Sequence, residues 1–410
     1  MTTTPIAPFC FDAVDSLLAQ WQWLWQPAPF VDIPHWCQQL PPLHQALLAL
    51  DEPEYQRLVA DDNACLDWLC QILPELDQLK PWRSEVSPRH TSLRGFSAGM
   101  GARKQGQVSA FVDAVSPQGR RLVEWCAGQG WLLEGLGQRF PERQLEGLEW
   151  QPRLCEQGNA RLNRAGISAL LRAADVLRDP LEFSTDDSLL ALHACGHLHQ
   201  ALLHQVVQQS VQDLALSPCC YHLGDRAALS QRGRSARLDA TLIDRHLAVQ
   251  DTGAGHGNRQ RRAEKTGQWR LGYDLLRRQL SGEQRYRPTP SWPGPLWQGS
   301  FTDYCQHCAR HHGLQLADDI DFNHWLQAGI TLHRQVRRLE LVRRQFRRPL
   351  EWWLVLDLGW HLVEHGYRVE ITPFCDRQLT PRNLLIRAER LSDVPARPEN
   401  GDSLPAPQPV

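Results

Sequence analysis

The stretch RLVEWCAGQG, residues 121–130, decides the fold of this chain. Its first half is apolar and is typical of a buried strand, and the residues that follow Gly130 have the pattern of a helix. Gly128 and Gly130 allow the backbone between them to turn tightly and to approach a ligand closely. The segment therefore predicts an α/β unit with a ligand-binding turn.

Strand and helix patterns alternate from residue 104 onward. Further strands are expected at LEGLEW (145–150), ALLRAADV (169–176), SLLALHA (188–194) and DLALSPCC (213–220). The helices between and before them are expected at 104–115, 130–139, 152–165 and 198–210. Strands separated by such helices form a parallel sheet with helices on both faces. A helix near 350–365 and the strands YRVEITPF and NLLIRAER then predict a hairpin that closes a doubly wound, Rossmann-like α/β sheet.

The rest of the chain is expected to be helical. We predict a helical N-terminal cap at 1–99, the core at 100–224, a helical Arg-rich insertion at 225–348, a C-terminal helix and hairpin that complete the core at 349–393, and a disordered tail at 394–410. Residues 1–99 carry five Lys or Arg against twelve Asp or Glu, whereas residues 226–350 carry twenty-two against eleven. The basic region favours a polyanionic partner, or alternatively a solvated surface.

Composition excludes several classes of protein. Hydrophobic content of 42% and charged content of 22% argue against wholesale disorder. No apolar run reaches the roughly 20 residues of a membrane span, and MTTTPIAPFC does not have the pattern of a signal peptide. We expect a cytoplasmic protein without membrane association, in which the 12 cysteines stay reduced.

Three acidic residues follow or end successive predicted strands. Glu124 is placed to accept from a ligand amino group, Glu149 to take two ribose hydroxyls, and Asp175 to bind an adenine amino group. A dinucleotide turn has a third glycine where this chain has Leu133, so close approach to a pyrophosphate is not provided for. S-adenosylmethionine (SAM) has no phosphate, and the pattern therefore favours SAM over NAD.

Two further motifs lie at predicted strand ends. They are His193-Ala194-Cys195-Gly196, and Ser217-Pro218-Cys219-Cys220-Tyr221-His222. Ligands bind at the carboxyl ends of strands in open α/β sheets, so both motifs are expected to face the methyl donor.

The chain here resembles a known family. EWCAGQG, HACG and SPCCYH are similar to the SAM-dependent methyltransferases that share an HxCG and a PCC[YH] element, which are distantly related to tRNA ribose 2′-O-methyltransferases. The closing ITPFC…TPRNLLI is similar to bacterial members, and the resemblance covers about residues 100–225 and 365–390. It implies a class I methyltransferase sheet and SAM as cofactor. The expected SAM-binding residues are Glu124, Cys126, Ala127, Gly128, Gly130, Glu149, Trp150, Asp175, Val176 and His193.

The catalytic candidates are His193, Cys195, Cys219 and His222. A thiolate of Cys195 or Cys219 could attack pyrimidine C6, while His193 or His222 could accept a proton from the acceptor. His and Cys side chains could instead bind zinc. Packing beneath SAM is the interpretation favoured by the sequence, and no metal site is assigned. Cys305-Gln306-His307-Cys308, with His311 and His312, could also bind zinc, but a helical surface is favoured there.

The basic clusters are candidates for nucleic-acid binding. They comprise Arg259, Arg261 and Arg262, and then Arg334, Arg337, Arg338, Arg344 and Arg348, which share roughly one helix face. Such a face can follow a phosphate backbone, with Trp269, Tyr286, Trp292 and Trp297 available to stack bases. RNA, in particular tRNA, is the expected acceptor. A protein or small-molecule methyltransferase, or a non-catalytic SAM-binding protein, is the alternative.

Overall fold

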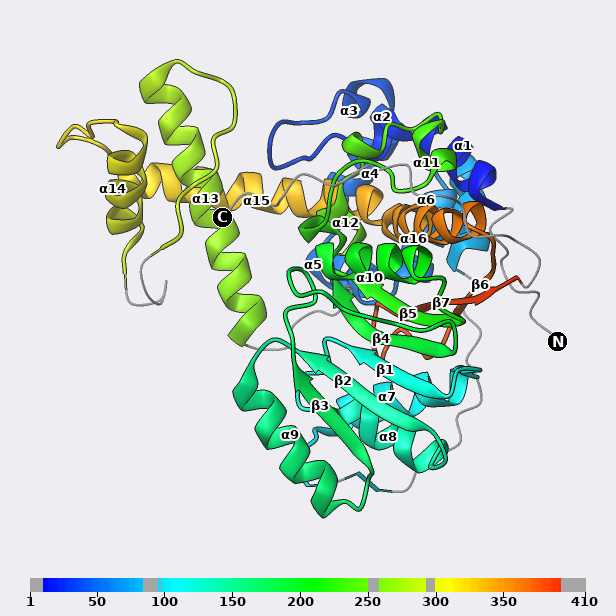
Figure 1. Ribbon diagram of the computed structural model, residues 1–410. Helices are drawn as coiled ribbons and strands as arrows, with labels where there is room; N and C mark the ends of the chain where they lie inside the picture. Colours follow the sequence, from blue (N-terminus) through cyan, green and yellow to red (C-terminus); the bar gives the residue numbers. More distant parts are fainter. Residues whose placement is uncertain (1–9, 84–94, 97, 250–257, 293–298, 392–410) are drawn as a thin grey trace. The chain divides into compact units, whose positions relative to one another are not determined.

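The computed structural model describes residues 10–83, 95–96, 98–249, 258–292 and 299–391 (Figure 1). The chain divides into two compact units. Unit 1 comprises Met1–Cys10, Val86–Ser235 and Val355–Val410, and unit 2 comprises Phe11–Glu85 and Ala236–Leu354.

Unit 1 is built on a seven-stranded sheet in the order β3-β2-β1-β4-β5-β7-β6. Strands β1 to β5 are parallel to one another, and β7 runs antiparallel to both β5 and β6. The strands are β1 (Arg121–Trp125), β2 (Gln144–Glu149), β3 (Ala169–Ala173), β4 (Asp187–Cys195), β5 (Asp213–Cys219), β6 (Tyr367–Pro373) and β7 (Leu384–Arg390). The late hairpin closes the sheet, as the sequence predicts, and its second strand is the one that pairs with β5.

Helices cover both faces of this sheet. The helices of unit 1 are α7 (Ala102–Ala114), α8 (Trp131–Arg139), α9 (Pro152–Arg164), α10 (His197–Gln208) and α11 (Gln231–Arg234), with the 3-10 helix η3 (Tyr221–Leu223) and the second part of α16 (Arg347–Glu364). Leu122 packs in a core with side chains of α7, α8 and α9. Trp125 lies three residues after Leu122 in the same strand, so its side chain points to the opposite face. Its Nε1 donates to the Leu198 carbonyl of α10 at 3.0 Å. The predicted doubly wound α/β fold class is confirmed.

The strands end earlier than expected at one place that matters for the site. β3 stops at Ala173, and Asp175 lies in the following turn. There the N–H of Asp175 donates to Oδ2 of Asp179 at 2.8 Å, and Oδ1 of Asp175 accepts from the N–H of Leu177 at 3.0 Å. These bonds take the backbone out of the ladder, so Asp175 and Val176 belong to a loop.

Unit 2 contains helices and no strand among its described residues. Its helices are α1 (Phe11–Gln20), α2 (Gln22–Trp25), α3 (Trp36–Gln39), α4 (Pro41–Ala49), α5 (Glu52–Ala60), α6 (Asp62–Cys70), η2 (Pro74–Arg83), η4 (Ala240–Leu242), α12 (Arg245–Ala248), α13 (Asn258–Ser281), α14 (Phe301–His312), α15 (Phe322–Arg344) and the first part of α16. Asp51 and Asp61 cap α5 and α6 by accepting from backbone N–H groups of their first turns. No helix among the described residues has the length and apolar character needed to cross a membrane.

Candidate cofactor and acceptor site

The turn after β1 is wound by left-handed residues. Cys126, Gly128 and Gly130 have φ angles of 57°, 58° and 70°. The N–H of Ala127 donates to the Leu148 carbonyl and the N–H of Gly130 to the Ala127 carbonyl, both at 2.8 Å. A Cβ atom at Gly128 would meet no atom within 4 Å, so this side of the turn faces open space where a ligand could approach.

Glu149 holds this turn from the end of β2. Its Oε2 accepts from the N–H of Gly128 at 2.9 Å, and its Oε1 accepts from the N–H of Gln151 at 3.0 Å. Each carboxylate oxygen can accept a further hydrogen bond. Glu149 is therefore both a support of the turn and a remaining acceptor for a ligand.

A cleft of about 360 Å³ lies beside the turn, within the size range of small-molecule sites. Carboxylates and apolar side chains line it together, and Trp150 at its rim is 68% exposed. The lining residues are Cys126, Leu148, Glu149, Trp150, Gln151, Leu154, Ala174, Asp175, Val176, Leu177 and Leu198. Five expected cofactor residues thus meet at one cleft, namely Cys126, Glu149, Trp150, Asp175 and Val176.

Glu124 lies buried behind the turn. Its Oε2 accepts from the N–H of Leu133 at 3.1 Å. Burial raises the pKa of Glu124 to about 8, although the charge of Lys104 opposes this shift. The pKa of Lys104 is lowered by burial, which outweighs the attraction of Glu124. A cationic ligand group near Glu124 would favour the ionised carboxylate.

Arg161 is a supporting residue that the sequence analysis missed. Its guanidinium donates to the carbonyls of Gln129 and Gly130 at 2.9 and 2.8 Å and forms a buried ion pair with Glu134. The same group lies over the Trp131 ring, 3.8 Å from its centroid. The sequence signal for the close approach of α9 to this turn is Gly158, in the middle of the helix. A Cβ atom there would lie 2.8 Å from the Gln129 carbonyl oxygen, so glycine allows α9 to lie against the turn that Arg161 contacts.

Backbone strain gathers at the same edge of the sheet. Four described non-glycine residues have positive φ, and three of them lie near the carboxyl ends of strands. Cys126 and Cys220 directly follow β1 and β5, and His193 lies two residues before the end of β4. His193 lies where the pairing of β4 with β5 shifts register between Leu192 and Ala194. Such conformations cost about 1–3 kcal/mol each and are concentrated at functional sites.

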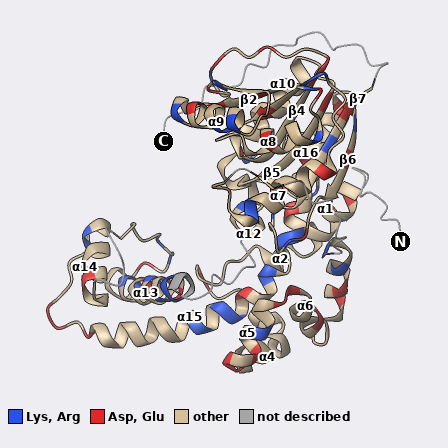
Figure 2. Cartoon of the chain, turned by 90° about the horizontal axis from the view of Figure 1, so that it is seen from below, with Lys and Arg blue, Asp and Glu red and all other residues tan. Residues whose placement is uncertain are grey.

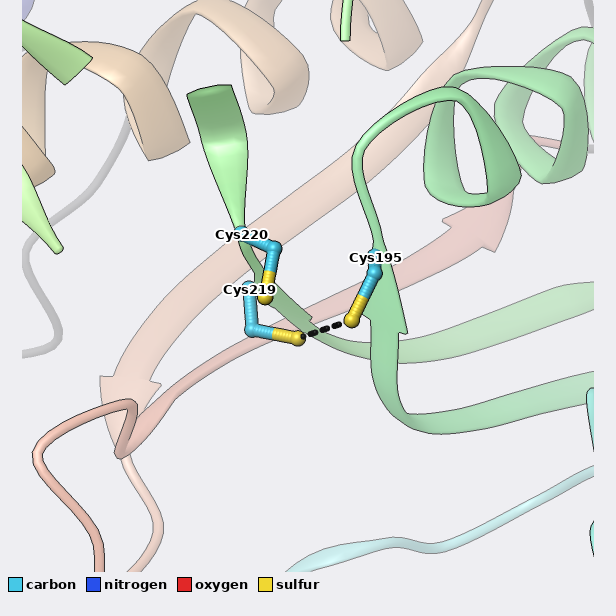
Figure 3. A group of neighbouring side chains, drawn as sticks. All are labelled: Cys195, Cys219 and Cys220. Atoms are coloured by element: carbon cyan, nitrogen blue, oxygen red, sulfur yellow. Dashed lines mark hydrogen bonds between the residues drawn. The ribbon is translucent and has the colours of Figure 1, made fainter. Parts of the chain in front are cut away.

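Three thiols meet beside this strained backbone. The Sγ atoms of Cys195 and Cys219 are 3.0 Å apart, and the Sγ of Cys220 lies within 4.8 Å of both (Figure 3). The hydrogen bond with Cys219 lowers the pKa of Cys195 to about 6, against the effect of burial. The same bond and burial raise the pKa of Cys219. The two sulfur atoms thus share one hydrogen bond, in which either thiol can be the donor.

His193 is held neutral at pH 7. Burial is the largest cause that lowers its pKa to about 4, and the charges of Lys104, Arg382 and Arg103 add to this effect. Its Nδ1 is buried and has no hydrogen-bond partner. His222 lies in η3, one turn beyond β5. Neither histidine joins the group of thiols as a close potential ligand.

The second cysteine pair lies elsewhere, in α14 of unit 2. Cys305 and Cys308 are both buried in a core with Trp269, Tyr273 and Tyr304, and burial raises the pKa of both thiols. The expectation of a helical surface is wrong for these two cysteines, because they occupy the inner face of the helix. Within the described residues, no third ligand gathers with them.

The basic residues predicted over Arg334–Arg348 lie on α15 and at the start of α16, where Figure 2 colours the Lys and Arg positions blue. Most of them are paired inside unit 2. Arg338 donates to the Leu50 carbonyl at 2.8 Å and Arg348 to Glu351 at 2.7 Å, and both guanidinium groups are buried. Arg337 contacts Glu264 and Glu52, and Arg344 contacts Asp62. Acidic and carbonyl groups of unit 2 thus already contact these four arginines, and Arg338 and Arg348 are buried. The four therefore do not present one continuous basic face.

The remaining basic candidates are placed differently. Arg261, Arg262 and Arg334 are exposed on α13 and α15. The side chain of Arg259 lies outside the described residues, as does Trp297. Trp269 is buried beneath Lys265, whose Nζ is 4.5 Å from the ring centroid, so it cannot stack a base.

Comparison with known proteins concerns mainly unit 1. Residues 103–225 match a family described as a methyltransferase domain. No curated protein matches the chain in sequence.

Solved structures of several methyltransferases are similar to about a third of the chain. The 23S rRNA methyltransferase ErmE is 16% identical (TM-score 0.23), and the match covers 30% of this chain and 46% of that one. The Pyrococcus abyssi tRNA (uracil-54, C5)-methyltransferase, solved with S-adenosyl-L-homocysteine, is 14% identical (TM-score 0.25), with 30% of each chain covered. A geranyl diphosphate methyltransferase solved with SAM is 18% identical (TM-score 0.24), with 32% and 62% covered. The chain thus spans less than two thirds of each of these three.

Proposed function

We propose that unit 1 binds SAM in the cleft beside β1, β2 and β3 and transfers its methyl group to an acceptor at the ends of β4 and β5. The observation that carries the proposal is the convergence of Glu149, Asp175 and the left-handed turn on one cleft of about 360 Å³. The methyltransferase-domain match over residues 103–225 supports the same activity.

The residues present fit the parts of SAM. Glu149 retains acceptor capacity for ribose hydroxyls, as the sequence predicts. Trp150 and Val176 offer apolar surface for an adenine ring, and Asp175 in the same lining could accept from its amino group. Glu124 supplies a carboxylate near the turn, and Gly128 leaves space for the chain of the ligand. When bound, SAM supplies an electrophilic methyl group on its sulfonium.

His193 is the proposed general base. Its imidazole is neutral at pH 7, and its Nδ1 has no protein partner, so that this nitrogen could accept a proton from a hydroxyl or amine acceptor. The residue is half-buried, which limits the access of water to this nitrogen. His222 remains a second candidate for the same task.

An RNA acceptor, with tRNA as the first choice, is supported by charge on this side of the sheet. Arg103, Lys104 and Arg382 all act electrostatically on His193. Three cations around one neutral base would attract a phosphate-bearing acceptor and would disfavour a cationic one. This cluster within unit 1 replaces the arginines of α15 as the basis for the proposal.

The experiment is transfer of labelled methyl from SAM to bacterial tRNA, total protein and a small-molecule extract, each offered to the purified protein. We expect labelled tRNA, and a reduction of at least about 10-fold in kcat/KM with Arg103→Ala, more at low than at high salt. Arg120→Ala is the matched control, because Arg120 is an exposed arginine of unit 1 that directly precedes β1, at the opposite ends of the parallel strands from His193. This substitution should leave the rate unchanged. If only protein or small molecules became labelled, RNA would be overturned as the acceptor. If the protein bound SAM tightly and nothing became labelled, the proposed catalysis would be overturned.

A further inference from the structure

The three thiols at the ends of β4 and β5 form a ligand set for which methyl transfer has no need. We propose that Cys195, Cys219 and Cys220 bind a zinc ion through three thiolates and leave its fourth coordination position open. The proposal rests on the placement of the sulfur atoms and does not depend on the proposed methyltransferase activity.

The distances between the sulfur atoms suit zinc after small side-chain rotations. All three Sγ atoms lie within 4.8 Å of one another. Tetrahedral zinc with bonds of about 2.3 Å to sulfur places its ligands about 3.8 Å apart. The 3.0 Å contact between Cys195 and Cys219 would open slightly, and the sulfur of Cys220 would approach.

The backbone brings two consecutive cysteines to the same point. Successive side chains of a strand point to opposite faces, so Cys219 and Cys220 should diverge. Cys220 instead has a φ of 48°, in the left-handed region, and its sulfur turns toward the other two (Figure 3). On the facing strand end, a Cβ atom at Gly196 would lie 2.5 Å from the Leu223 backbone, so only glycine allows the two segments to approach this closely. The left-handed turn thus brings three sulfur atoms together, an arrangement that packing alone would not require.

Charge around the cluster favours the loaded state. Zinc with three thiolates carries a net charge of minus one. Lys104 acts electrostatically on Cys219, and Arg382 on Cys220, so both cations would stabilise that charge.

The ligand count indicates an open site. Among the residues that the structure describes, no His, Asp or Glu side chain joins the three cysteines within the same distance. Structural zinc sites have four protein ligands, whereas sites with three keep a position for water or another small ligand. We infer that the fourth ligand is exchangeable.

The test uses the full chain, reduced, stripped with a chelator and titrated with Co²⁺ as the spectroscopic probe for zinc. We expect about one equivalent to bind with sulfur-to-cobalt charge-transfer and tetrahedral d–d bands, and Zn²⁺ to displace it. Cys195→Ser and Cys220→Ser should each weaken Co²⁺ binding by more than about 10-fold. Loss of a residue that only hydrogen-bonds to a metal ligand already costs about 10-fold in affinity, and these substitutions remove a ligand itself. Binding that follows Cu⁺ but not Zn²⁺ or Co²⁺ would overturn the assignment to zinc.

Two controls keep the result interpretable if a variant fails to fold. The double substitution Cys305→Ala with Cys308→Ala removes the only C-x-x-C pair of the insertion and should leave the cobalt spectrum unchanged. In the unaltered protein, Zn²⁺ should protect Cys195, Cys219 and Cys220 from iodoacetamide, as read by mass spectrometry, and should not protect the partly exposed Cys70. Absence of thiolate bands, bands lost in the double variant, or alkylation unaffected by Zn²⁺ would each overturn the proposal.

Discussion

Oε2 of Glu149 accepts a hydrogen bond of 2.9 Å from the backbone N–H of Gly128. The bond ties the end of β2 to the turn after β1, although 21 positions separate the two residues along the chain. A carboxylate that shapes the turn also borders the cleft. Changes at Glu149 should therefore affect the ligand in two ways, through a lost acceptor and through a loosened turn.

Glu149→Ala should weaken SAM binding by about 10- to 100-fold, since a hydrogen bond to a charged group contributes about 1.5–3 kcal/mol. Glu149→Gln keeps one acceptor oxygen and should lose less. Isothermal titration calorimetry measures both. Glu146→Ala is the control, because Glu146 lies on the same strand but pairs with Arg121 and Arg172. Equal affinity of Glu149→Ala and the unaltered protein would contradict the assignment of the cleft.

Gly128→Arg should abolish SAM binding while the chain remains folded. The new side chain would extend into the open space above the turn, and the left-handed φ of 58° adds only about 1–2 kcal/mol of strain for a residue other than glycine. Cys126 already adopts a φ of 57° in the same turn. Thermal unfolding and SAM titration of the same sample check the prediction, with Gly128→Ala as the smaller matched change. A variant that unfolds would show instead that the glycine is needed for folding.

Arg161→Met should lower the free energy of unfolding by about 3–5 kcal/mol, because it leaves Glu134 buried without its counter-charge. Glu134→Leu in the same chain removes that charge, so the double variant should recover part of the loss. Urea denaturation of the two single variants and the double variant measures the coupling. Strict additivity would mean that the pair does not act as a unit.

Ionisation of Glu124 should make the protein less stable as pH rises. Its folded-state pKa of about 8 lies above the ordinary value of 4.5, so the folded chain keeps a proton that the unfolded chain has lost between these two pH values. The contribution to stability is full below about pH 4.5 and is lost as pH rises to about 8. Compared with Glu124→Gln, the unaltered protein should therefore lose stability over this range in urea denaturation. Parallel pH profiles of the two proteins would show that Glu124 does not titrate in this way.

The sheet of unit 1 and its ligand-binding turn could be predicted from the sequence because both depend on patterns among neighbouring residues. Apolar periodicity places all seven strands of the sheet, and glycines at 128 and 130 mark the turn. The spacing of Glu149 from that turn predicts that the two lie close together, and Glu149 borders the cleft beside the turn. The position of Asp175 was also predicted, although β3 ends two residues before it.

Other features depend on contacts between distant segments and could not be predicted. Arg347 binds Asp62, and Arg338 binds the Leu50 carbonyl, so the charge segregation of the sequence becomes pairing between cap and insertion within unit 2. A helical spacing of arginines cannot distinguish a paired face from a solvated one. The sulfur atom of Cys220 lies close to that of Cys219 because the backbone of Cys220 is left-handed. The sequence SPCCYH does not reveal this conformation.

The division of unit 1 into separate segments has a consequence for synthesis on the ribosome. β5 ends at Cys219, but its neighbour β7 begins only at Leu384, after the second segment of unit 2 has been made. Until then the edge of β5 has no strand to pair with, and unpaired edges are prone to association with other chains. The edge of β5 therefore stays unpaired during synthesis of residues 220–383. We expect the yield of folded protein to depend on chaperones and on the rate of elongation.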